Sequence, residues 1–311
     1  MKNLKMAIWM AAGALLVAAP AFPQTGQGRA VVTILPKQHG EALASVSQQA
    51  LSLKVNGKPA TITSWAPLSE ANDSLELVIL IDGSARSTLG NQLDDIAHFV
   101  NSLPPNAKAA IAYMQNGIAY FAGPLTANHV QVLQALHLPG GSPGSSASPY
   151  FCISDLAKRW PSTDRMARRV AVLVTDGVDN YNLRYDPQDP YVEAAVNDSV
   201  RAGLVVYMIY WQNQGLLSRT AYENNAGENL MLQVTDATGG KSFWEGFGNP
   251  VSFQPYFEEL TRRLQNQYLV GFSVPLNGKP TAENLKLKVS GVVAEVVAPQ
   301  QVFVSQAGAA Q

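Results

Sequence analysis

The sequence contains very little cysteine and histidine. Its 311 residues include one cysteine, Cys152, and four histidines. A single cysteine excludes an intrachain disulfide, and one thiol beside four imidazoles leaves too few ligands for a cysteine-rich zinc site. The fold therefore has to form without disulfide or zinc crosslinks.

An excess of charge of one sign is also missing. The chain carries 22 lysines and arginines against 23 aspartates and glutamates, and neither sign forms a long run. Because no basic stripe is present to face a phosphate backbone, we expect no nucleic-acid partner. Hydrophobic residues make up 47% of the chain and charged residues 14%, a composition that excludes wholesale disorder and provides for a sizeable core.

The N-terminus has the pattern of a secretory signal peptide. Two lysines precede an apolar run over residues 6–19, and the small residues Ala19 and Ala21 stand where a cleavage site requires them. We expect cleavage to remove residues 1–21, so that the mature protein starts at Phe22 and is secreted or periplasmic. An uncleaved membrane anchor is the alternative, but the run is shorter than the roughly 20 residues of a spanning helix. We expect no membrane span after cleavage.

Short strand-like segments occur at both ends of the chain. They cover residues 30–35, 51–55, 60–63, 268–274, 285–289 and 302–304. Asn56-Gly57 predicts a β-hairpin, because both central positions of a type I′ turn need positive φ, and Asn116-Gly117 predicts a second hairpin in the middle of the chain. Neither end is large enough to bury a core of its own. We therefore predict that an N-terminal β segment, residues 22–70, packs with a C-terminal one, residues 267–311.

Between these ends, strands alternate with helices. The predicted strands cover residues 75–81, 109–114, 118–121, 170–174, 204–210 and 242–244. The predicted helices cover residues 88–103, 130–136, 150–160, 191–202, 228–238 and 254–264. Several of the strands are almost entirely apolar, as strands covered on both faces must be. This alternation predicts an α/β fold with a doubly wound, mostly parallel sheet over residues 71–266.

Two aspartates follow two of the apolar strands. Asp82 comes directly after Ile81, and Asp176 comes directly after Thr175. In a doubly wound sheet of strand order 3-2-1-4-5-6, the first and fourth strands are neighbours at the switch point where ligands bind, so the two aspartates should converge. With the nearby hydroxyls they would form an all-oxygen site suited to Mg²⁺. The alternative is that each aspartate only caps the helix that follows it.

Three segments resemble motifs of von Willebrand factor type A (VWA) domains. Asp82-Gly83-Ser84-Ala85-Arg86 is similar to the D-x-S-x-S segment, Gly140-Gly141-Ser142 to the Gly-Gly-Thr loop, and Thr175-Asp176-Gly177 to the T-D-G strand end. The resemblance spans about residues 71–266, and the flanking β segments are similar to those of secreted bacterial proteins with a VWA-related domain. It implies a metal-ion-dependent adhesion site that an acidic side chain of a partner completes. By position, the cation residues would be Asp82, Ser84, Ser142 and Asp176.

Arg86 replaces the second serine of the D-x-S-x-S pattern. It offers no oxygen and carries a permanent positive charge. Ser87 is a runner-up ligand in place of Arg86, and Ser145 or Ser146 could take the role of Ser142. Either the site binds Mg²⁺ weakly with more water ligands, or Arg86 forms an ion pair with the two aspartates instead of a cation. We favour the ion pair, because it satisfies the buried carboxylates without metal.

An enzyme is the weaker interpretation. Residues 140–144 match the G-x-S-x-G pattern of serine hydrolases. However, a predicted helix precedes this segment where a hydrolase has a strand, and every histidine lies upstream of Ser142. We therefore predict a protein without enzymatic activity and keep a serine hydrolase as a minor alternative.

The segment of residues 211–227 follows a strand at the same edge of the sheet as the two aspartates. It carries Trp211, Arg219 and Tyr222, whose side-chain types often anchor protein interfaces. We predict that it forms a partner-binding lip, with a short irregular helix as the alternative. Together, these features predict an extracytoplasmic adhesion or assembly module that binds a protein or surface polymer at this edge. A structural scaffold without metal or ligand there is the second possibility.

Overall fold

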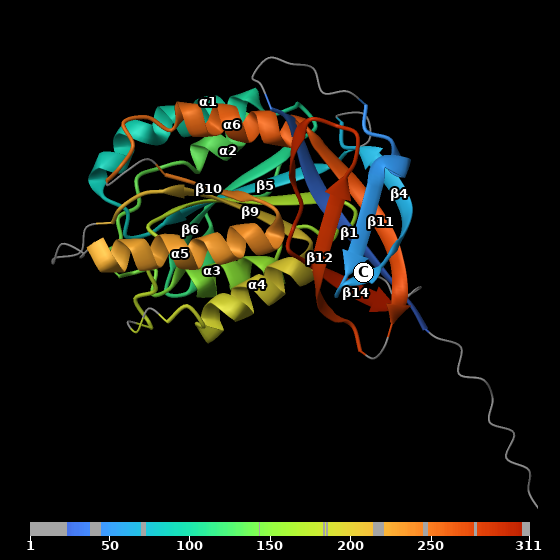
Figure 1. Cartoon of the computed structure of the whole chain (residues 1–311). Helices are drawn as coiled ribbons and strands as arrows, with labels where there is room; N and C mark the ends of the chain where they lie inside the picture. The colour runs from blue at the N-terminus through green and yellow to red at the C-terminus, as the bar shows by residue number, and fades with distance from the viewer. Residues whose placement is uncertain are drawn as a thin grey trace, which may run out of the picture.

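The computed structural model describes most of the chain. The described residues are 24–37, 45–69, 73–142, 144–182, 184, 186–213, 221–244, 248–276 and 279–306. They form a central sheet with helices on both faces and a second, antiparallel sheet beside it (Figure 1). The predicted signal peptide and its cleavage site lie outside the described residues. Within the described part, no helix has the length and apolar character that crossing a membrane requires.

Within the described residues, the central sheet has six strands. They are β5 (Leu75–Asp82), β6 (Lys108–Gln115), β7 (Ile118–Phe121), β8 (Arg168–Thr175), β9 (Leu204–Tyr210) and β10 (Lys241–Phe243). Their order is β10-β9-β8-β5-β6-β7, and every neighbouring pair except β6 and β7 is parallel. Numbered from β5, this is the predicted order 3-2-1-4-5-6. The doubly wound, mostly parallel sheet and the contact between its first and fourth strands are therefore confirmed.

Helices cover both faces of this sheet. They are α1 (Leu93–Ser102), α2 (His129–Gln134), α3 (Pro149–Lys158), α4 (Pro190–Ala202), α5 (Ala221–Thr238) and α6 (Gln254–Gln265), with 3₁₀ turns at Gln48–Ala50 and Ser87–Gln92. Helices α1, α2 and α6 lie on one face, and α3, α4 and α5 lie on the other (Figure 1). The helix predicted over residues 88–103 is α-helical only from Leu93, because the weak helix formers Gly90 and Asn91 lie in the 3₁₀ turn.

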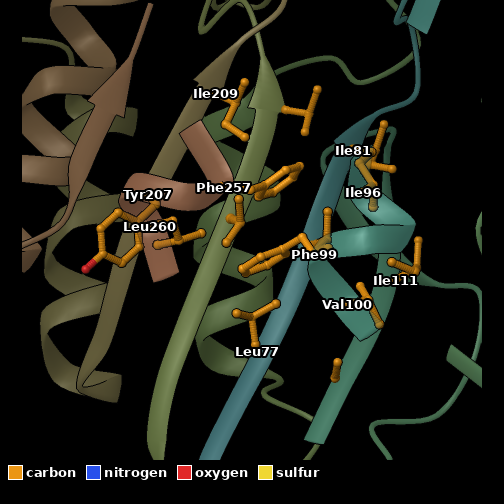
Figure 2. Close-up of a cluster of buried hydrophobic side chains, with 14 of the residues drawn as sticks. Leu77, Ile81, Ile96, Phe99, Val100, Ile111, Tyr207, Ile209, Phe257 and Leu260 are labelled. Carbon is orange, nitrogen blue, oxygen red and sulfur yellow. The ribbon is translucent and has the colours of Figure 1, made fainter. Parts of the chain in front are cut away.

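Apolar side chains alternate between the two faces of each central strand. On β5, Leu77, Ile79 and Ile81 point toward α1 and α6, while Val78 and Leu80 point toward α3 and α4. Figure 2 shows the first of these two cores. Its labelled side chains are Leu77, Ile81, Ile96, Phe99, Val100, Ile111, Tyr207, Ile209, Phe257 and Leu260. Burial on both faces explains why these strands are continuous apolar runs.

The second sheet, here called the flanking sheet, is built from both ends of the chain. Its strands are β1 (Gln24–Pro36), β2 (Leu51–Val55), β3 (Lys58–Pro59), β4 (Thr61–Pro67), β11 (Gln267–Leu276), β12 (Thr281–Val289), β13 (Ala294–Val297) and β14 (Gln301–Gln306). The order is β3-β2-β12-β14-β1-β11-β4, and β13 pairs with β1. Strand β2 pairs with β12. This confirms the prediction that residues 51–55 lie against the strands of the tail.

The two predicted Asn-Gly turns are present. Asn56 and Gly57 join β2 to β3 with φ of 47° and 76°, and Asn116 and Gly117 join β6 to β7 with φ of 49° and 75°. Positive φ at both central residues is the geometry of a type I′ turn, which matches the twist of the strands that it joins. Both hairpin predictions are therefore confirmed.

The two sheets meet at the amino ends of the parallel strands. Arg168, the first residue of β8, pairs with Asp73 at 2.5 Å and donates to the side-chain oxygen of Gln267 at 2.5 Å. Gln267 in turn donates to the hydroxyl of Tyr207 at 3.0 Å. Burial raises the pKa of Asp73, and the charge of Arg168 acts against this rise. These contacts place the carboxyl ends of the parallel strands on the side of the molecule away from the flanking sheet.

Candidate functional site

Asp82 ends β5 and is 2% exposed. One carboxylate oxygen, Oδ1, accepts hydrogen bonds from the backbone N–H of Ser84 at 2.9 Å and from its hydroxyl at 2.6 Å. The other, Oδ2, accepts from the hydroxyl of Thr175 at 2.8 Å and from the amide of Asn213 at 2.9 Å. A carboxylate has about four acceptor positions, so uncharged donors of the protein fill all of them.

Asp176 follows β8 and is 1% exposed. Its Oδ1 accepts from the backbone N–H of Val178 at 3.1 Å, and its Oδ2 accepts from the backbone N–H of Asn213 at 3.3 Å. Asn213 thus contacts both carboxylates, one through its side chain and one through its backbone. The two aspartates converge where β5 and β8 end, as the strand order predicted.

Two glycines let a serine-containing loop lie on the turn after β5. A Cβ on Gly83 would lie 2.3 Å from the carbonyl oxygen of Met114, and a Cβ on Gly141 would lie 2.4 Å from both the carbonyl oxygen of Gly83 and the hydroxyl of Ser145. The Ser145 hydroxyl is buried and has no hydrogen-bond partner within the described residues, whereas Ser142 is exposed. Of the loop serines that the sequence offered, Ser145 therefore contacts the turn after β5.

Arg86 lies at the same edge and is partly buried. Burial lowers the pKa of its guanidinium, and the charges of Tyr210 and Asp176 act in the opposite direction. Its Nε is buried without a hydrogen-bond partner among the described residues. Uncharged donors occupy the acceptor positions of Asp82, and the predicted ion pair of Arg86 with the two aspartates stays a prediction. That the positive charge of Arg86 takes the place of a bound cation also stays a prediction. Ser87 is exposed at the start of the 3₁₀ turn.

Asn213 is the residue of this site that the sequence motifs did not reveal. It lies three residues after the end of β9, in no segment that resembles a motif. Its position was nevertheless informative, since β9 neighbours β8 and both strands end at the same edge. A polar residue just past the end of the next parallel strand is the signal that could have identified it.

A cluster of three aromatic rings lies on the same side of the sheet. The rings of Phe151, Tyr181 and Tyr191 contact one another edge to face, with centroids 4.7 to 5.5 Å apart. Phe151 also packs on Gly117, in the turn between β6 and β7, where an added Cβ would lie 3.2 Å from it. Tyr181 is 65% exposed. It presents a supported aromatic ring to solvent at the edge that carries Asp176.

The predicted partner-binding lip is corrected by the structure. Trp211 is 2% exposed and packs edge to face on Phe253 with centroids 5.5 Å apart, so it is a core residue and not an interface anchor. Residues from Ala221 onward belong to α5, which starts earlier than predicted because its first turns carry few apolar residues to mark a helix. Tyr222 is 66% exposed on this helix. Arg219 lies outside the described residues.

The oxygen atoms at this edge are of the type that a hard cation prefers as ligands. Within the described residues there is no group of three or more His, Cys, Asp or Glu side chains that could hold a metal ion. The set instead combines two carboxylates with hydroxyls, and Ser145 Oγ and Asn213 Oδ1 are buried oxygens without a partner. Oxygen ligands of this type are those that Mg²⁺ prefers. The donor set therefore fits a cation, while the positive charge of Arg86 opposes one.

Comparisons with known proteins find similar folds but no similar sequence. No protein-family model matches the sequence, and no curated protein matches it. Among solved structures, BatB from Bacteroides thetaiotaomicron is 16% identical with a TM-score of 0.44, and the match covers 61% of this chain and 97% of that one.

Two further solved structures have a similar fold. The SpRpn10 VWA domain is 13% identical with a TM-score of 0.38, and the match covers 60% of this chain and 95% of that one. The pilus adhesin SpaC from Lactobacillus rhamnosus GG is 9% identical with a TM-score of 0.44, and the match covers 87% of this chain and 49% of that one. These likenesses concern the fold alone. The SpRpn10 VWA domain is therefore among the solved structures that are similar to this chain in fold.

Proposed function

We propose that this protein is an extracytoplasmic, non-enzymatic module that binds another protein or a surface polymer at the carboxyl edge of its central sheet. One observation carries the proposal: two buried carboxylates lie there with two buried oxygen atoms that have no partner, Ser145 Oγ and Asn213 Oδ1. Buried polar atoms in folded proteins almost always have hydrogen-bond partners, so such atoms indicate a place where a ligand or ion completes the structure.

A cation is the group that best fits these oxygen atoms. Asp82, Ser84, Asp176 and Ser145 would hold it, and Ser145 would replace the exposed Ser142 in the set implied by the resemblance. Mg²⁺ bound there would supply a positive charge for an acidic side chain of the partner. The chain's own residues would orient it, since Asn213 and Thr175 fix the carboxylate of Asp82 by hydrogen bonds.

Tyr181 is the residue that we expect to anchor the partner. Aromatic side chains are enriched among the residues that contribute most to binding, because they bury a large area at a low cost in conformational entropy. Contacts with Phe151 and Tyr191 hold the Tyr181 ring in place before any partner arrives. This takes over the role that the sequence suggested for Trp211.

The proposal includes no enzymatic step. The G-x-S-x-G segment lies between α2 and α3, so no strand leads into it and the strand–turn–helix context of a hydrolase nucleophile is not met. The extracytoplasmic location rests on the signal-peptide pattern of residues 1–21. N-terminal sequencing of the exported protein should find Phe22 as the first residue.

A pull-down of proteins from the extracytoplasmic fraction of the source tests the binding function. We expect the native protein to capture a partner, and Tyr181→Ala to weaken the affinity roughly thirtyfold, since a central aromatic anchor contributes about 2 kcal/mol or more. Val293→Ala is the matched control. It truncates an exposed residue between β12 and β13 of the flanking sheet, and this variant should capture the partner normally. Equal capture by both variants would exclude Tyr181 as the anchor.

A structural scaffold without metal is the second candidate. It is favoured by the observation that uncharged donors already fill the acceptor positions of Asp82. The same pull-down in EDTA separates the two functions. Loss of capture in EDTA that Mg²⁺ restores supports a metal-dependent module, whereas the absence of any specific partner in either condition supports the scaffold.

A further inference from the structure

A groove lies at the opposite end of the molecule from the candidate site, where the central sheet meets the flanking sheet. It has a volume of about 730 Å³ and is bounded by the ends of α3 and α4, the start of β8, and the strands β1 and β14. Figure 1 shows α4 running toward β12 and β14 at this junction. We call it the basic groove because five basic side chains line it: Arg29, Lys158, Arg165, Arg169 and Arg201.

Positive charge dominates the lining of the basic groove. Among the described residues that line it, Asp198 is the single acidic side chain. Asp198 is already engaged, since it pairs with Lys158 at 2.9 Å and accepts a hydrogen bond from Ser154 at 2.5 Å. The surplus of positive charge stands out in a chain whose net charge is −1.

Uncharged groups hold three of the arginines in place. The guanidinium of Arg169 lies 5.7 Å from the centre of the Trp160 ring, and that of Arg201 lies 5.4 Å from the centre of the Phe303 ring. Arg29 donates to the sulfur of Met166 at 3.2 Å. Within the described part of the chain, none of these three arginines pairs with a carboxylate. Arg169 also donates to the backbone carbonyls of Ser162, Asp164 and Ala202, and Arg29 to that of Arg165. These contacts fix the guanidinium groups without neutralising their charges.

The arginines also act on one another. Burial lowers the pKa of Arg169, and the like charges of Arg29 and Arg165 lower it further. The negative charges of Glu76 and Asp164 act in the opposite direction. Like charges that are held close together repel one another, and an anion placed between them relieves this repulsion. The groove is therefore electrostatically prepared for a negatively charged ligand.

We propose that the basic groove binds a small polyanion that carries two or more phosphate or carboxylate groups. The planar fork of a guanidinium matches the oxygen atoms of both groups and binds them with paired hydrogen bonds. A volume of about 730 Å³ lies within the range of small-molecule sites. Hydroxyls from Ser162, Thr163 and Ser305 line the same groove and supply further donors. Because the groove spans both sheets, the ligand would also hold them together.

Calorimetric titration of the purified protein with tripolyphosphate and, separately, with citrate tests this proposal in 150 mM NaCl. We expect at least one probe to bind, and to raise the melting temperature, because a ligand of the folded state stabilises it. The variant Arg29→Gln/Arg201→Gln should weaken binding by roughly tenfold or more, since each lost guanidinium removes charge-assisted hydrogen bonds. The matched control Lys54→Gln/Lys288→Gln removes two exposed charges outside the groove and should bind normally.

The outcomes separate the two ligand chemistries and also allow the proposal to fail. Binding of tripolyphosphate only assigns the groove to phosphate groups, and binding of citrate only assigns it to carboxylates. If the double variant does not fold, Arg201→Gln alone, a change of one exposed residue, should still weaken binding several-fold. The proposal is overturned if neither probe binds, or if the variant and its control lose affinity equally. Neither result depends on the function at the carboxyl edge.

Discussion

Asp82 is a buried carboxylate whose charge is stabilised by uncharged groups. Transfer of a carboxylate into a protein interior costs several kcal/mol, and hydrogen bonds to a charged group each return about 1.5 to 3 kcal/mol. Four such bonds, from Ser84, Thr175 and Asn213, offset this cost without a cation or an arginine. Arg86 is therefore not needed to stabilise this side chain, although its charge still acts on any ion that approaches.

The substitution Arg86→Ser tests how this arginine acts. We expect it to lower the free energy of unfolding by less than about 1 kcal/mol, because a partly exposed charge without an ion pair contributes little. It also removes a positive charge and adds a hydroxyl, so millimolar Mg²⁺ should raise the melting temperature of the variant and leave that of the native protein unchanged. Thermal melts with Mg²⁺ and with EDTA measure both effects.

Arg86→Lys is the matched control for this experiment, since it keeps the charge and should show no response to Mg²⁺. Two results would contradict the prediction. A loss of about 3 to 5 kcal/mol in Arg86→Ser would show that a buried ion pair had been broken. A rise in melting temperature of the native protein with Mg²⁺, abolished by Asp82→Ala, would show that a cation binds despite Arg86.

Cys152 gives a prediction about pH. Burial raises the pKa of its thiol, and the charges of Asp82 and Asp155 raise it further. The unfolded thiol ionises near pH 8.5, so the folded state holds this proton more tightly than the unfolded state does. The contribution of the thiol to stability is therefore complete below about pH 8.5 and falls by about 1.4 kcal/mol per pH unit above it.

Urea unfolding of the native protein and of Cys152→Ala between pH 7 and pH 10 measures this effect. Other groups titrate in the same range, but they are common to both proteins and cancel in the difference. The native protein should lose stability relative to the variant as the pH rises above about 8.5. A difference that stays constant with pH, or rapid reaction of the folded thiol with a disulfide reagent at pH 8, would refute the prediction.

The sequence predicted the part of the site that regular strands position. Asp82 and Asp176 were identifiable because each directly follows a strand, and strand order brings them together. Asn213 and Ser145 were not, because a loop places them, and loop conformation depends on close contacts such as that of Gly141 with the carbonyl oxygen of Gly83. Such contacts leave no periodic pattern in a sequence.

At the scale of elements, the close approach of Gly83 to β6 sets the geometry of the site. Its N–H donates to the carbonyl oxygen of Met114 at 3.1 Å, and a Cβ would lie 2.3 Å from that oxygen. We expect Gly83→Ala to lower the free energy of unfolding by about 1 to 3 kcal/mol, because backbone would have to move. Gly90→Ala is the control: no atom lies within 4 Å of its Cβ, and we expect a gain of less than about 1 kcal/mol. Equal effects in chemical denaturation would show that the approach is not tight.

The elements that were predicted less well are those whose pattern of apolar and polar residues fits more than one structure. Trp211 directly continues the apolar strand β9, and its large ring fills the core beside Phe253, so the aromatic side chain marked burial and not an interface. The start of α5 carries few apolar residues, and a helix without an apolar stripe cannot be told from a loop. Tyr181, in contrast, became a candidate only when α3 and α4 were seen to bring Phe151 and Tyr191 against it.

At the scale of the whole molecule, the flanking sheet depends on both ends of the chain. Strand β11 lies between β1 and β4, and β12 pairs with β2. Deletion of residues 267–311 would leave these partners with unpaired edges and would remove Gln267 from Arg168. We expect the truncated protein to aggregate or to melt well below the native protein, as exposed edge strands do. Soluble protein with an unchanged melting temperature would show that the central sheet does not require the tail.

The pairing of the two ends was predictable because neither could bury a core alone. The basic groove was not predictable, since Arg29, Arg169 and Arg201 come from three elements that lie far apart in the sequence. Counts of charge and searches for basic runs cannot detect such a cluster. Only the packing of α4 and β8 against β1 and β14 brings the arginines together.

The meeting of β1 and β14 determines how the molecule would respond to mechanical force. Gly26, near the start of β1, is the antiparallel neighbour of Gln306, at the end of β14. A pull on both ends of the chain would therefore act first on two adjacent strand ends, and would peel them apart one hydrogen bond at a time. The chain enters the central sheet after β4 and leaves it before β11, and these two strands pair with each other. The central sheet would therefore carry load only after β1 had been removed and the β4–β11 pair had separated. Under tension, the flanking sheet would yield first and leave the carboxyl edge folded.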